Sequence, residues 1–150
     1  MEPKELFEVL ARQTENLAKM KETADKKQRA LISHDYKQLE ASITEEQSLL
    51  ISIQAAEKER ITLMNTICRT MGVKIDNYRL YEFVDKTGDR IDRKSAGELL
   101  KAEEKLREII LAIQNQNQKN LYLIEHSRAF VKETLMTVLQ SRKKLLDKKV

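Results

Sequence analysis

The sequence predicts an all-α fold: an antiparallel hairpin of two long helices, a short helix and a long C-terminal helix, together forming an elongated helical bundle. Two observations support it. Charged residues make up 35% of the chain and aromatic residues 5%, with one proline and three glycines, which favours long helices. Apolar residues also recur three and four positions apart over long stretches, the period of an amphipathic helix. At 150 residues we expect a single domain, residues 1–150.

Residues 1–71 are predicted to form the hairpin. A seven-residue apolar rhythm runs from Leu6 to Leu31 and is interrupted at residues 33–35, where Asp35 and Gln38 have the spacing of an N-terminal capping box. The rhythm then resumes and ends at Gly72, a typical C-terminal stop. Since neither helix is stable with an uncovered apolar stripe, the two should pack together. The residues expected between them are Leu10, Leu17, Leu39, Ile43, Leu50 and Ile53.

Residues 72–94 are predicted to hold a short helix and a loop. Asp76 is the candidate cap of this helix, and the loop is the turn-rich stretch 85–89. The apolar residues of this segment should cover the end of the hairpin, because aromatic side chains bury much area each; a ligand pocket is the alternative. These residues are Tyr78, Leu80, Tyr81, Phe83 and Val84. A second capping-box pattern, from Ser95 to Glu98, predicts that the last helix covers residues 95–150.

The last helix changes character along its length. Its first half has a regular apolar stripe through Leu99, Leu106 and Ile113, which should pack on the hairpin. In the second half the stripe becomes partly polar, while apolar residues flank it on both edges. This wide, mixed face suits a groove-type binder of a helical segment, because apolar side chains give affinity and amides fix register. The alternative is an ordinary buried or self-associating helix in which asparagine sets the register.

The sequence shows no catalytic, metal or cofactor site. His34 and His126 have no ligand partners at metal spacing, and glycine-rich phosphate loops are absent. The single cysteine, Cys68, lies in an apolar pattern and should be buried. Glu57 and Arg60, three residues apart on the second helix, are expected to form a structural ion pair. We therefore predict that the protein is not an enzyme.

The charge distribution does not favour nucleic-acid binding, and the apolar pattern and the N-terminus predict a cytoplasmic protein. The net charge of +4 comes from the last ten residues, 141–150, whereas the rest of the chain is balanced. A basic tail without stacking aromatics does not favour nucleic acid, although a charge-driven surface binder stays open and the role of the tail is undetermined. No apolar run is long enough to span a membrane, and the N-terminus lacks the pattern of a signal peptide.

Residues 117–131, with the sequence NQKNLYLIEHSRAFV, resemble the Asn-x-x-Asn, leucine/isoleucine and serine pattern of the FlgN family of flagellar type III export chaperones. Earlier segments are also similar to that family: Arg29-Ala30-Leu31 with Asp35 and Leu39, then Glu46, Leu49-Leu50, Glu57 and Arg60. The resemblance therefore covers nearly the whole chain.

This resemblance implies a cytoplasmic chaperone for hook-filament junction (hook-associated) proteins. Such a chaperone binds the C-terminal helical segment of its client, prevents premature assembly and delivers the client to the flagellar type III export apparatus without a nucleotide or other cofactor. The client-binding residues would be Asn117, Asn120, Leu121, Ile124, Ser127, Val131 and Leu135. We expect this face to be free in the unbound protein. Contacts with export-apparatus components and weak homo-oligomerisation stay open, and a structural coiled-coil oligomerisation or adaptor protein without a client is the alternative function.

Overall fold

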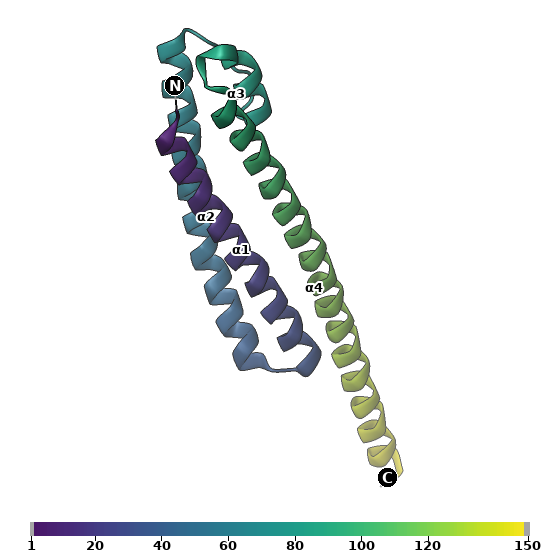
Figure 1. Cartoon of the computed structure of the whole chain (residues 1–150). Coiled ribbons are helices and arrows are strands. Elements are labelled where there is room, and N and C mark those ends of the chain that lie inside the picture. Colours follow the sequence, from purple (N-terminus) through teal and green to yellow (C-terminus); the bar gives the residue numbers. More distant parts are fainter. Residues whose placement is uncertain (1, 149–150) are drawn as a thin grey trace.

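The protein is an elongated bundle of long helices, as the sequence predicts. A computed structural model describes residues 2–148, and within them all side chains except those of Phe130, Val131, Thr134 and Lys148. In order, the elements are α1 (Lys4–Ser33), α2 (Tyr36–Met71), α3 (Leu80–Thr87), a 3-10 turn η1 (Gly88–Arg90) and α4 (Arg93–Lys148). α1 and α2 form an antiparallel hairpin, α3 lies at the end opposite the hairpin turn, and α4 runs parallel to α1 (Figure 1).

Local hydrogen bonds and left-handed residues determine where α1 ends, and where α2 begins and ends. His34 takes the left-handed conformation (φ 57°) after α1, and the Asp35 side chain accepts a hydrogen bond from the Gln38 N–H at 3.1 Å, which confirms the predicted cap. Gly72, at φ 67°, ends α2, and the Val73 N–H bonds the Cys68 carbonyl at 2.8 Å. This is the six-to-one bond of a Schellman motif.

Two predicted helix starts are wrong. α3 begins at Leu80 rather than after Asp76, because the Glu82 carboxylate accepts the backbone N–H groups of Asp76 and Asn77 and holds them in a turn. α4 begins at Arg93, and Asp92 rather than Ser95 is its cap, since the Asp92 carboxylate accepts the Ser95 N–H at 3.0 Å.

The main core lies where α3 meets the other helices. Fully buried side chains from all four helices meet there, including Leu6, Met64, Phe83 and Leu99. The prediction that the aromatic segment covers this end of the hairpin is confirmed. A second, smaller cluster joins α1 to α4 and consists of Leu17, Met20 and Ile113.

The hairpin packs in a rotation that the sequence analysis did not predict. Leu10 and Leu17 are buried and Leu39 and Ile53 are half-buried, but Ile43 and Leu50 are exposed. Between Tyr36 and Ala56 the buried residues of α2 are Ser42 and Ala56 instead. Their small side chains let α1 approach closely. Ile43 follows Ser42 by one position, so its side chain is rotated by about 100° toward the flank of the helix.

Candidate functional site

The last part of α4 extends beyond the hairpin turn, and no other helix of the described chain lies beside it there (Figure 1). Every side chain that the structure describes from Arg128 to Asp147 is exposed. Among them are six large apolar residues: Leu135, Met136, Val138, Leu139, Leu145 and Leu146. A helix that faced only water would have no use for so many large apolar side chains. Exposed apolar patches of this kind mark interaction surfaces.

Before this projecting part, α4 packs on α1 through two polar side chains. Asn120 is only 1% exposed, and its Nδ2 donates to the Ala24 carbonyl oxygen at 3.0 Å. One turn earlier, Gln116 is buried and donates through its Nε2 to Gln28 Oε1. We call this pair of contacts the polar seam. The Asn120 Oδ1 atom is buried and has no hydrogen-bond partner within the described part of the chain.

The predicted client-facing stripe is therefore divided between two faces of α4. Asn120 belongs to the polar seam, so the expectation that it is free in the unbound protein is wrong; the nearby Ala24 carbonyl gives its amide a partner that the sequence could not reveal. Ser127 is half-buried. The Val131 side chain lies outside the described residues.

The other predicted residues are accessible and lie close to one line along α4. Asn117 and Leu121 are exposed, Ile124 is half-buried and Leu135 is 58% exposed. At about 100° per residue, all four fall within some 40° of the direction of Leu135. We call this line the α4 flank. It presents apolar side chains with one amide among them, which suits the apolar face of an incoming helix.

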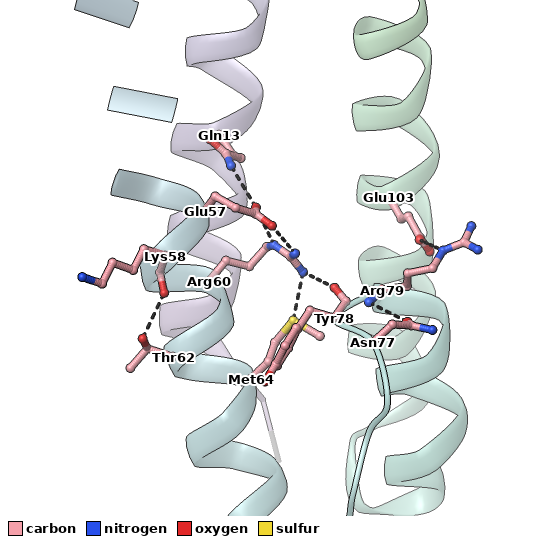
Figure 2. A network of polar contacts seen from close by, with 10 residues as sticks. All are labelled: Gln13, Glu57, Lys58, Arg60, Thr62, Met64, Asn77, Tyr78, Arg79 and Glu103. Carbon is pink, nitrogen blue, oxygen red and sulfur yellow. Dashed lines mark hydrogen bonds and ion pairs between the residues drawn. The ribbon is translucent and has the colours of Figure 1, made fainter. Parts of the chain in front are cut away.

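A polar network fastens the connection between α2 and α3 to the hairpin (Figure 2). Arg60 donates to both Glu57 oxygens at 2.5 and 2.9 Å and to the Tyr78 carbonyl oxygen. Gln13 of α1 donates to Glu57 at 3.2 Å. The Arg60 hydrogen bond holds the pKa of Glu57 below its ordinary value, against the opposing effect of burial. The network has a structural role: it joins three segments of chain.

The remaining titratable candidates do not converge on a reaction centre. His34 and His126 are both exposed, and His126 stacks on Tyr122 with ring centroids 6.0 Å apart. Cys68 is buried, as predicted, and burial raises the pKa of its thiol. In the described part of the chain, no three His, Cys, Asp or Glu residues are close enough together to hold a metal ion.

Every helix within residues 2–148 falls short of the length or the apolarity that is needed to cross a membrane.

An elongated helical bundle with an exposed apolar flank on a projecting helix is a protein-binding module. The chain belongs to the FlgN family: the family model described as FlgN protein matches residues 1–146. This match confirms the resemblance found in the sequence and makes the protein a flagellar export chaperone, a class that binds flagellar export substrates and is not known for enzymatic activity. Neither a curated protein nor a solved structure matches the chain significantly.

Proposed function

We propose that this chaperone acts in the cytoplasm and binds the C-terminal helical segment of a hook-filament junction protein along the second half of α4. The observation that supports this most directly is the α4 flank, where Leu121 and Leu135 are 56% and 58% exposed in the free protein. Covering such side chains is favourable by roughly 25 cal/mol for each Å² of apolar surface removed from water.

The residues of the predicted site take two roles in this proposal. The client contacts Asn117, Leu121, Ile124 and Leu135. Ser127 and Val131 are assigned to the same contact because of their spacing in the sequence. Asn120 acts through its hydrogen bond to α1, which holds α4 in one rotation and so keeps the flank accessible. We therefore assign Asn120 a positioning role in place of direct client contact.

Binding of this kind explains how one helix can protect a client and still release it. A client segment that is unstructured alone would fold on the flank, and the entropy lost on ordering offsets part of the contact energy. The covered segment cannot assemble with its neighbours while it is bound. Release at the export apparatus then needs only modest competition for the same apolar face, without a nucleotide on the chaperone.

Calorimetric titration with the C-terminal segment of a hook-filament junction protein tests the proposal. Leu135→Asp places a charge on the flank and should weaken binding by about 2 kcal/mol or more. Met136→Asp is the matched control: Met136 is also exposed (52%) but is rotated by about 100°. Equal binding by both variants and the unmodified chain would refute the assignment of this face.

The projecting apolar residues also favour one alternative, a structural coiled-coil adaptor that associates with itself. Leu135, Leu139 and Leu146 lie near one line of α4 and would suit a partner helix from a second copy. Light scattering of the purified protein over a range of concentrations separates the two functions. A mass that rises with concentration in the absence of client, together with no client binding, would favour the adaptor.

A further inference from the structure

A cavity of about 340 Å³ lies between α1, α2, α4 and the segment that precedes α3. Its apolar lining includes Leu17, Leu80 and Leu106, and it opens to solvent beside Ile110 and Leu111, which are 41% and 51% exposed. This volume is at the lower end of the range found for ligand sites, about 300–1,000 Å³. It is large enough for a bulky apolar side chain.

Gln13 lines this cavity and has an unused hydrogen-bonding group. Its side chain is 5% exposed, its Nε2 donates to Glu57, and its buried Oε1 atom has no hydrogen-bond partner among the described residues. Glu57 is an acceptor whose pKa is lowered, so Gln13 must present its N–H group to it. The amide oxygen is then left as an acceptor. A buried acceptor of this kind is costly in the free protein and is satisfied when a donor enters.

The lining of the cavity holds three arginines and two glutamates, which is one surplus positive charge. Arg79 and Arg107 lie 3.7 and 4.0 Å from the same carboxylate, that of Glu103. Glu103 also accepts the Tyr81 N–H at 3.0 Å (Figure 2 includes the pair of Arg79 with Glu103). One carboxylate is therefore shared by two exposed guanidinium groups, each with donors left for a second anion.

Beyond the cavity, apolar residues continue along both walls. On α2 the side of the helix that carries Glu57 also carries Leu50 and Ile43, seven and fourteen residues earlier, which are 48% and 40% exposed. On α4 the flank continues from Ile110 to Leu121. α1 packs along both helices, whereas the backbones of α2 and α4 approach each other closely at almost no point. We call the space between α2 and α4, into which the cavity opens, the groove; a fourth helix placed there would complete a four-helix bundle.

We propose that this groove between α2 and α4 binds an acidic amphipathic helix of the export client, which rests on the proposed function for the identity of the occupant. One bulky apolar side chain enters the cavity beside a donor to Gln13 Oε1, and an acidic side chain binds Arg79 and Arg107. The occupant is a helix because helical walls offer no free backbone groups, so the incoming segment must satisfy its own main chain. From Ile110 to Leu121 the α4 side of the groove spans about 17 Å at 1.5 Å per residue, and the α4 flank continues beyond the hairpin turn to Leu135.

Site-specific fluorescence tests where the client lies. Because the only cysteine, Cys68, is buried, an introduced exposed cysteine can be labelled selectively with an environment-sensitive dye. Leu50→Cys places the dye in the groove. Ile51→Cys is the matched control, since Ile51 is 69% exposed and rotated away from the groove. Addition of the full-length hook-filament junction protein should shift the emission at position 50 to shorter wavelength and leave that at position 51 unchanged.

A charge reversal tests whether the arginines at the opening of the cavity bind an acidic side chain of the client. Arg107→Glu should weaken binding of the same junction protein by about tenfold or more, because a steering charge becomes a repulsive one. Lys105→Glu makes the same change of charge on an exposed residue of the opposite flank and should change the affinity less than about twofold.

The outcomes separate this inference from the proposed function. If the junction protein binds but the dye at position 50 does not respond, or if both charge reversals act equally, the groove is not its site and only this inference fails. If the junction protein does not bind the unmodified chaperone at all, the proposed function fails, and the occupant assigned to the groove fails with it.

Discussion

Replacing Asn120 by Asp should destabilise the free protein strongly, because it puts a negative charge into the polar seam. The side chain is 1% exposed, and the atom nearest to its amide nitrogen across the seam is the Ala24 carbonyl oxygen, 3.0 Å away. In Asn120→Asp a carboxylate oxygen would face that carbonyl oxygen in place of the amide donor. Uncompensated buried charges of this kind cost about 3–5 kcal/mol. For a chain of this size the melting temperature should fall by about 6–20 °C.

Asn117→Asp is the control, since it makes the same substitution three residues earlier on the same helix, where the side chain is exposed. Its effect should stay within about 0.5 kcal/mol, or roughly 2 °C. Thermal unfolding followed by circular dichroism at neutral pH measures both. If the two variants melt at the same temperature, Asn120 does not hold α4 to α1, and the positioning role assigned to it is wrong.

Three further predictions concern the core, the polar network and the hairpin. Phe83→Ala removes a fully buried ring and should cost about 3–5 kcal/mol in urea unfolding; a loss under about 1 kcal/mol would contradict the core placement. The lowered pKa of Glu57 stabilises the fold above its ordinary value of 4.5, and this contribution is lost as pH falls through the folded-state value. The stability difference between the unmodified chain and Glu57→Gln should therefore shrink below about pH 5, and a constant difference down to pH 3 would argue against it. Leu50→Asp should cost under about 1 kcal/mol by thermal unfolding, since Leu50 is half-exposed, whereas a loss above about 3 kcal/mol would return Leu50 to the hairpin interface.

Helix boundaries in the hairpin could be predicted because their causes are local in sequence. Asp35 accepts an N–H three residues later, and Gly72 takes a left-handed conformation that few other residues tolerate. The starts of α3 and α4 were predicted wrongly because several residues compete to cap each helix. Asp92 precedes Ser95 and bonds its N–H, and Glu82 takes the backbone groups near Asp76 from a position further along the chain.

The rotation of α2 could not be predicted, because an apolar stripe reveals that a surface is covered but not which neighbour covers it. Ile43 and Leu50 give the apolar signal in the first half of α2, so the sequence analysis placed them against α1. The buried residues between Tyr36 and Ala56 are Ser42 and Ala56, which contribute little to an apolar pattern. What they provide is space for a close approach of the two helices.

The change of environment along α4 could be predicted from the sequence, but the surroundings of each residue could not. The switch from apolar to polar spacing in α4 correctly marked where its environment changes. It could not separate Asn117 from Asn120, since both are asparagines on adjacent turns and only the position of the Ala24 carbonyl distinguishes them. The unpaired Gln13 oxygen was equally hidden, because its cause is the hydrogen bond that Glu57 takes from the other end of the same amide.

The polar seam gives a physical reason for asparagine and glutamine at positions where leucine would pack more stably. Apolar contacts such as that of Ile113 with Leu17 hold α4 against α1 but tolerate small rotations, since dispersion has little directional preference. A hydrogen bond requires alignment, so the bond from Asn120 to Ala24 fixes the rotation of α4 just before the helix leaves the hairpin. A rotation of only one residue step, about 100°, would turn Leu121 from the groove into solvent. The unpaired Asn120 oxygen makes this bond a costly way to hold two helices together, and a directional role accounts for that cost where stability alone does not.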